Sequence, residues 1–220
     1  MIRALPASSP IFDQACTACP RLAQFLRKVR KEYPGYYARP VPSFGSARAS
    51  LVIVGLAPGL HGANRTGRPF TGDYAGVLLY RTLHRFGFAS HAGSADPKDR
   101  LRLIGCRIAN AVKCVPPQNR PETHEIRRCN HYLAAELCEV RPRAVLALGA
   151  IAHRSVLLAL GAKRPAPRFA HGATHDLPAP WGDARLFDCY HCSRYNTNTR
   201  RLTPEMFEAV FRDISEFLSA

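Results

Sequence analysis

The residues best suited to chemistry lie between positions 55 and 76, where glycine recurs at positions 55, 59, 62, 67, 72 and 76. Glycine lets a backbone turn sharply and approach a ligand closely. The same stretch holds one aromatic ring, Phe70, and one carboxylate, Asp73. An aromatic ring is a stacking surface for a planar ligand. These residues predict a pocket for a flat, polar molecule. The structural alternatives are a core phenylalanine and an aspartate that caps a helix.

Two further polar side chains follow apolar segments. Asn110 interrupts the run Ile108-Ala109-Asn110-Ala111-Val112. Its amide offers a donor and an acceptor side by side, which matches the carbonyl and N–H edge of a pyrimidine. His191 follows the apolar stretch 185–190, where a ring nitrogen could stabilise a developing oxyanion. A buried amide satisfied by backbone and a structural histidine are the alternatives.

The eight cysteines predict a metal site. Cys16 and Cys19 form a C-x2-C pair, and two single thiols follow at Cys114 and Cys129. Two close and two distant thiolates suit an iron–sulfur cluster or zinc. A second C-x2-C pair, Cys189 and Cys192, is a competitor for the same role. A disulfide framework is not expected, because the thiol pool of a cytoplasm keeps such cysteines reduced.

Alternating elements position these residues. The apolar patterns predict helices over 20–31, 74–87, 122–138, 150–160 and 204–218, and strands over 51–56, 103–112, 144–148 and 185–190. This order predicts one α/β domain over residues 1–220, with a three-layer α/β/α architecture and a central, mainly parallel four-stranded sheet. Ligands bind such sheets beyond the carboxyl ends of the strands. The glycine loop and the loops 113–120 and 191–201 should therefore form one site.

Charge indicates the partner. The chain carries 31 Lys and Arg residues against 16 Asp and Glu, a formal charge of +15. Arginine dominates, and its planar fork favours phosphate, so we expect a polyanion such as nucleic acid; an arginine-rich genome is the alternative. The chain has no apolar run long enough for a bilayer and no signal-peptide core near Met1. We therefore expect a cytoplasmic, monomeric protein without membrane contact.

Four segments together carry a family resemblance: Gly55-Leu56-Ala57-Pro58-Gly59, Gly67-Arg68-Pro69-Phe70-Thr71-Gly72-Asp73, Asn110-Ala111-Val112-Lys113-Cys114-Val115-Pro116-Pro117 and His191-Cys192-Ser193. In this order they resemble the uracil-DNA glycosylase superfamily, and most closely family 5, the type-b enzymes of bacteria and archaea. Family 4 has Glu in place of Leu56 and Pro in place of Cys192. Because Leu56 cannot handle a proton, the acidic residue of family 4 has no counterpart here. The resemblance runs from about Cys16 to the end of the helix 204–218.

The resemblance implies a monofunctional base-excision repair enzyme. Such an enzyme flips uracil out of DNA and hydrolyses its N-glycosidic bond, leaving an abasic site. It implies base contacts from Gly55, Ala57, Gly59, Phe70, Asn110 and His191. Asp73 would stabilise the sugar cation or orient the attacking water, and Asn119 is a second candidate for holding that water. Small residues around Ala57, Gly59 and Ala63 suggest that hypoxanthine and other deaminated bases also fit.

The resemblance also implies a cofactor. It maps Cys16, Cys19, Cys114 and Cys129 onto a four-cysteine iron–sulfur cluster, expected as 4Fe–4S, and leaves Cys189 and Cys192 as bystanders. The cluster would tie the N-terminal segment to the loop after the second strand.

Basic side chains are expected to hold the DNA. Contacts to phosphate are predicted for Arg65, Arg68, Arg120, Arg200 and Arg201. Arg194 or Tyr195 would occupy the gap left by the flipped base, unless this loop only caps the last helix.

Two other functions remain as alternatives. One is a non-catalytic, nucleic-acid-binding iron–sulfur or zinc module on the same fold. The other is a nucleotide-cofactor site in the glycine loop. It is disfavoured because neither G-x-G-x-x-G nor G-x-x-x-x-G-K-[ST] occurs.

Overall fold

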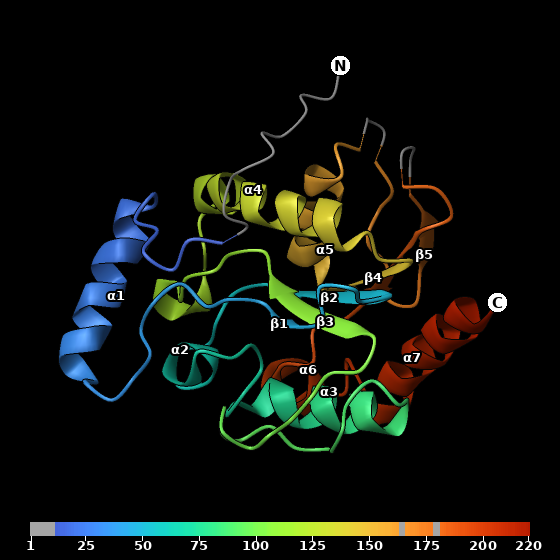
Figure 1. Cartoon of the computed structure of the whole chain (residues 1–220), viewed down its shortest axis with the longest axis horizontal. Helices are drawn as coiled ribbons and strands as arrows, with labels where there is room; N and C mark the ends of the chain where they lie inside the picture. The colour runs from blue at the N-terminus through green and yellow to red at the C-terminus, as the bar shows by residue number, and fades with distance from the viewer. Residues whose placement is uncertain (1–11, 163–165, 178–180) are drawn as a thin grey trace.

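The computed structural model describes residues 12–162, 166–177 and 181–220 (Figure 1). The prediction about the segment near Met1 lies outside these residues. A six-stranded sheet forms the centre, in the order β1-β3-β2-β4-β6-β5. Its strands are β1 (Phe44–Gly45), β2 (Leu51–Gly55), β3 (Cys106–Asn110), β4 (Ala144–Leu148), β5 (Thr174–Asp176) and β6 (Arg185–Cys189). The four inner strands are parallel, as predicted, and β1 and β5 pair antiparallel at the two edges.

Helices cover both faces of the sheet. The long helices are α1 (Pro20–Glu32), α3 (Tyr74–Arg85), α4 (Thr123–Val140), α5 (Ala150–Ala159) and α7 (Pro204–Ser219). Figure 1 shows α4 and α5 on one side of the sheet and α3 and α7 on the other. Because side chains alternate along a strand, Leu51 and Ile53 join the core beneath α3 and α7, while Val52 and Val54 join the core beneath α4 and α5. The predicted three layers are confirmed.

Several short elements were not predicted. These are β1, β5, α2 (Ala63–Thr66), α6 (Arg194–Asn198) and a single 3-10 turn, Pro117–Asn119. The segment 191–201, expected as a loop, therefore contains a helix, which Ser193 caps by accepting a hydrogen bond from the Asn196 N–H at 3.4 Å. Elements of two to five residues are too short for periodicity to reveal.

The boundaries of the predicted long elements differ from the observed ones by only a few residues. The predicted strand 103–112 is the least accurate, because only Cys106–Asn110 is strand. Within the described residues, none of the helices is both long enough and apolar enough to cross a bilayer.

Candidate active site

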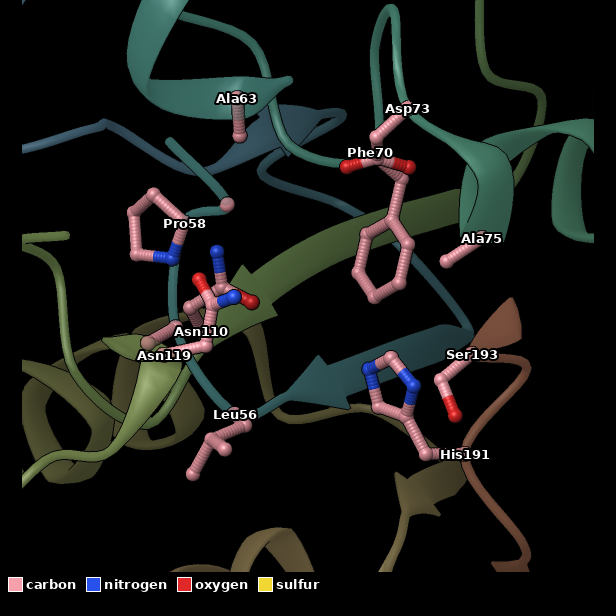
Figure 2. A pocket seen from close by; sticks show the side chains of 12 residues that line it. Leu56, Pro58, Ala63, Phe70, Asp73, Ala75, Asn110, Asn119, His191 and Ser193 are labelled. Atoms are coloured by element: carbon pink, nitrogen blue, oxygen red, sulfur yellow. The ribbon is translucent and has the colours of Figure 1, made fainter. Parts of the chain in front are cut away.

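A cavity of about 350 Å³ lies at the carboxyl ends of the parallel strands. Its lining includes Phe70, Asp73, Asn110, Asn119 and His191 (Figure 2). These residues come from the glycine loop, from the end of β3 and the loop after it, and from the loop after β6. Ala57, Gly59 and Ala63 also line the cavity, as does Leu56. Pro58, Ala75 and Ser193 complete the lining, and the sequence had predicted no role for them. The structure therefore brings the predicted catalytic and base-binding side chains into one cavity.

Gly55 lies behind the cavity and is not among the residues that line it. It ends β2, opposite Asn110 of β3. A Cβ at position 55 would lie 2.5 Å from Asn110 Oδ1 and 2.8 Å from Phe70 Cζ. Contacts this short would displace both side chains. The lack of a side chain at Gly55 thus leaves room for Phe70 and Asn110, and its predicted base contact stays a prediction.

The backbone and ring of Phe70 are packed against neighbouring residues. The backbone has φ 53°, in the left-handed region that glycine favours. A side chain at position 76 would clash with the Phe70 carbonyl oxygen, so the close approach requires Gly76. The Phe70 ring is nearly parallel to that of His191, with a centroid separation of 5.8 Å and an interplanar angle of 27°. Residues from two loops thus form one aromatic wall of the cavity.

The Asn110 side chain lines the cavity. The residue is 3% exposed, and its buried Oδ1 has no hydrogen-bond partner among the described residues. An unpaired buried polar atom costs about 1–3 kcal/mol. Three other buried oxygens also lack a partner among these residues, Asn64 Oδ1, Thr82 Oγ1 and Ser215 Oγ, but only Asn110 lines the cavity. The structure thus rejects the alternative that backbone groups satisfy this oxygen.

Asp73 is both a helix cap and a cavity residue. It accepts a hydrogen bond through Oδ1 from the Gly76 N–H at 2.8 Å and so begins α3. The second oxygen, Oδ2, lies near the glycine loop, because a Cβ at Gly62 would come within 2.5 Å of it. Burial raises the pKa of Asp73, although hydrogen bonds from the Gly76 and Ala75 backbones oppose the shift. A carboxylate with a raised pKa in a cavity is suited to acid–base chemistry.

His191 follows β6 and enters the cavity beside Ser193 (Figure 2). Desolvation lowers the pKa of His191 to about 4. The ring is therefore neutral at pH 7, with one N–H donor and one acceptor nitrogen. The Asn196 side chain donates to the His191 carbonyl at 2.8 Å, which links the histidine to α6.

Arg68 does not face the solvent. Its side chain is only 8% exposed, and two of its nitrogens lie 2.9 and 2.6 Å from the carboxylate oxygens of Asp99. It also donates to Thr71 and Ser94, each at 2.8 Å. The predicted phosphate contact of Arg68 is therefore not supported. This arginine anchors the connection 89–100 to the glycine loop.

The other basic residues predicted to hold DNA are exposed: Arg65, Arg120, Arg194, Arg200 and Arg201. Tyr195 is 71% exposed in the first turn of α6, which also carries Arg194. The Arg194 guanidinium lies 5.0 Å from the Tyr74 ring centroid, and that of Arg201 lies 4.5 Å from the Tyr190 ring centroid. These positions leave their predicted roles open to test.

The four predicted cysteine ligands line one small cavity of about 20 Å³. Cys16 and Cys19 precede α1, Cys114 follows β3, and Cys129 lies in α4. Desolvation raises the pKa of Cys114, and it raises that of Cys129 to about 11. As free thiols both would stay protonated at pH 7, so a metal would have to displace their protons.

The spacing of these sulfur atoms is wider than zinc requires. Tetrahedral zinc with Zn–S bonds of about 2.3 Å needs sulfur atoms about 3.8 Å apart. Among the described residues, the groups of three or more potential ligand atoms within 4.8 Å of one another do not include these cysteines. Four thiols around one cavity are the ligand type of both an iron–sulfur cluster and zinc, so the predicted cluster stays a prediction.

The sequence matches one family model and is similar to several known proteins. The family model described as "Uracil DNA glycosylase superfamily" matches residues 42–215. The chain is 44% identical over 205 residues to the "Type-5 uracil-DNA glycosylase" of Thermus thermophilus, covering 90% of this chain and 92% of the relative. It is 42% identical over 201 residues to the protein of that name from Pyrobaculum aerophilum, covering 90% and 86%. A "Type-4 uracil-DNA glycosylase" from the same archaeon is 34% identical over 147 residues, covering 66% and 61%.

Proposed function

Because the chain belongs to the uracil DNA glycosylase superfamily, within its type-5 group, we propose that it excises uracil from DNA as a base-excision repair enzyme. The reaction breaks the bond between C1′ of the deoxyribose and the base. The electron pair of this bond leaves with the base, and water adds to C1′, so an abasic site remains. The observation that carries the proposal is the meeting of the Asn110 amide, the Phe70 ring and the Asp73 carboxylate in one cavity.

Each cavity residue supports one part of this reaction. The Asn110 amide can pair with the N–H and carbonyl edge of uracil, and Phe70 offers a face for stacking, which contributes about 1–3 kcal/mol per base. Neutral His191 can donate its ring N–H to the oxygen that becomes negative as the base departs. As an anion, Asp73 can stabilise the sugar cation or orient the attacking water, and Asn119 offers an amide that can hold that water.

Strand cleavage tests the proposal. Duplexes that contain U·G, U·A or only undamaged pairs are incubated with the protein, heated in alkali and resolved on a gel. We expect scission at uracil, faster opposite G, because a mispaired base is less costly to flip. Asp73→Asn should lower the single-turnover rate by about 10²–10⁴. Asparagine still caps α3, so the fold should be retained.

Exposed Asp213→Asn on α7 serves as the matched control and should cleave at the wild-type rate. Protein that binds these duplexes but produces no alkali-labile site would instead be a non-catalytic nucleic-acid-binding module.

We also propose that the enzyme excises deaminated bases other than uracil. The base-facing lining is small, with Ala57, Gly59, Ala63 and Ala75 around a cavity of about 350 Å³. These side chains leave room for the second ring of hypoxanthine. A hypoxanthine duplex in the same assay should therefore also be cut. Cleavage of uracil alone would contradict this extension.

We propose that Cys16, Cys19, Cys114 and Cys129 hold an iron–sulfur cluster of the 4Fe–4S type. When bound, the cluster supplies four metal–sulfur links that clamp the N-terminal segment to the loop after β3. Its role here is structural, because hydrolysis of a glycosidic bond transfers no electrons. The charge pair of Arg21 with Glu125, with contacts of 2.9 and 2.6 Å, holds α1 against α4 beside these cysteines.

Iron analysis tests the cluster. Anaerobically purified wild type should be brown and contain about four iron and four sulfide per chain. Cys129→Ala should lose this colour and iron, whereas Cys138→Ala, in the same helix but exposed, should keep both. Circular dichroism identifies any variant that is simply unfolded. A colourless wild type with zinc bound would contradict the assignment.

The proposal also covers the location, the oligomeric state and the domain organisation of the protein. The organisms of the relatives are bacteria and an archaeon, which supports a cytoplasmic location with the chromosome. We also propose that one chain acts alone on damaged DNA, because the proposed catalytic side chains form a complete set in one cavity of a single copy. Residues 1–220 would form a single domain, with an N-terminal segment tied in by the cluster.

A further inference from the structure

A second hollow, of about 500 Å³, lies between α3 and the segment that joins α6 to α7. We call it the α3–α6 groove. Tyr74, Val77 and Arg81 line it from α3, and Thr197, Arg200 and Glu205 line it from the other side. Apart from Arg200, these residues have no part in the chemistry described above.

The groove continues from the catalytic cavity along two elements. Asp73 caps α3 and lines the cavity, and the next residue, Tyr74, lines the groove. Ser193 caps α6 and lines the cavity, and Thr197, one turn later, lines the groove. Thr197 Oγ1 lies 3.3 Å from the Tyr74 hydroxyl, which joins the two walls. A polymer whose one unit enters the cavity would therefore reach the groove with its neighbouring units.

The side chains of the groove suit a nucleic-acid strand. Tyr74 is 41% and Val77 is 64% exposed, so both offer apolar surface to a ligand in the groove. Tyr74, Val77 and Arg81 are spaced by three and four residues, so they share one face of α3. Arg81 and Arg200 add exposed positive charge. Sugars and bases suit such apolar contacts, and phosphates suit arginine.

The groove lining includes one acidic residue, Glu205, in the first turn of α7. A hydrogen bond from its own backbone N–H, then one from the Thr203 side chain, lower the pKa of Glu205, and the charge of Arg81 adds to this shift. Glu205 therefore offsets part of the positive charge in the groove. Arg81 and Arg200 together exceed it, so the lining keeps a net positive charge.

We propose that the α3–α6 groove binds the damaged strand next to the flipped nucleotide, with Arg81 on a backbone phosphate. This inference rests on the proposed function. From Tyr74 to Arg81 the helix rises about 10 Å, which equals about three nucleotides at 3.4 Å each. The groove thus holds a short flank on one side of the lesion and contributes affinity there, independent of base sequence.

Binding to trimmed duplexes tests the proposal without cleavage. Duplexes with a tetrahydrofuran abasic-site analogue are used at full length, or with the damaged strand trimmed to one nucleotide on its 5′ or its 3′ side. Fluorescence anisotropy is measured for wild type and Arg81→Ala. The matched control is Arg212→Ala, which removes an exposed arginine of α7, two turns beyond Glu205.

We expect Arg81→Ala to bind the full-length duplex about three- to tenfold more weakly, with a salt slope smaller by about one. Trimming one flank of the damaged strand should abolish this difference, and trimming the other flank should preserve it. The proposal is overturned if Arg81→Ala behaves like Arg212→Ala, or if its deficit survives both when the 5′ flank is trimmed and when the 3′ flank is trimmed. Wild type that binds the analogue but leaves uracil duplexes intact overturns the proposed function alone.

Discussion

At the scale of single residues, Asn110 brings to the cavity a buried side-chain oxygen that has no hydrogen-bond partner in the part of the chain that the structure describes. Asn110→Ala removes that oxygen together with some packing, and these two effects on stability oppose each other. We expect the free energy of unfolding to change by less than about 1 kcal/mol. The rate of uracil release should fall about 10- to 100-fold, because the amide's bonds to the base are lost.

Urea unfolding and single-turnover cleavage check this prediction together. Asn130→Ala is the matched control, because Asn130 is equally buried but donates to the Ser155 carbonyl at 2.8 Å. Asn130→Ala should have a smaller free energy of unfolding than wild type and should cleave at the wild-type rate. Equal loss of stability in both variants would contradict a ligand-directed role for Asn110.

The pH dependence of cleavage follows from Asp73 and His191. Burial raises the pKa of Asp73, so its carboxylate gains a proton at a higher pH than an exposed aspartate would. With enzyme in excess, the cleavage rate should be constant near neutral pH and fall as the solution becomes acidic. His191, with a pKa near 4, stays neutral over that range and adds no change near pH 6.5. Rates of wild type and Asp73→Asn from pH 5 to 9 check this prediction. A fall that persists in Asp73→Asn would assign it to another group.

At the scale of elements, the glycine loop leaves space for the Asp73 carboxylate, because Gly62 carries no side chain. A Cβ at Gly62 would lie 2.5 Å from both Cβ and Oδ2 of Asp73, so Gly62→Ala must displace that carboxylate. We expect cleavage to slow about 10- to 100-fold with little change in melting temperature. Gly35→Ala is the control, since a Cβ there meets nothing within 4 Å. Wild-type cleavage by Gly62→Ala would show that the position of Asp73 is not critical.

A histidine–aspartate pair joins α5 to β6. His153 Nδ1 lies 2.8 Å from Asp188 Oδ1, and its Nε2 lies 3.0 Å from the Pro167 carbonyl oxygen. Both partners are acceptors, so both ring nitrogens donate and His153 is a cation. Burial lowers its pKa, but the hydrogen bonds to Asp188 and Pro167 outweigh this and raise the pKa of His153 overall.

The sign of the linkage follows from that raised pKa. The stabilisation is complete below the pKa of an unfolded histidine, about 6.5, and is lost as the pH rises through the folded value. Urea unfolding at pH 6 and pH 9 should therefore show a larger loss of stability in wild type than in His153→Gln. Exposed His84→Gln should behave like wild type. Equal losses in all three proteins would contradict a charged His153.

The sequence predicted the long elements and the meeting of three strand-end loops, because buried parallel strands are continuous apolar runs and their carboxyl ends share one rim. Asp73, Asn110 and His191 could be found for that reason. Arg68 could not be assigned, since its partner Asp99 is 31 residues away and nothing local marks the pair. The helix α6 escaped detection for a related reason, because its five residues carry no apolar stripe.

At the scale of the whole molecule, the charge of +15 predicts binding that depends strongly on salt. Arg120 is exposed in the loop that carries Asn119 into the cavity. Arg120→Ala should lower the slope of log Kd against log salt by about one, equally for uracil-containing and undamaged duplexes. Arg141→Ala, where α4 ends before β4, is the control and should leave the slope unchanged. A changed preference between the duplexes would reject a phosphate contact for Arg120.

The two edge strands of the sheet are short: β1 has two residues and β5 has three. A long outer strand would offer a row of free N–H and C=O groups to another chain, and such rows initiate fibrils. Proteins gathered along a polyanion meet their own copies at high local density, where that hazard is greatest. The short edge strands of this sheet should therefore let many copies bind one stretch of DNA without aggregating.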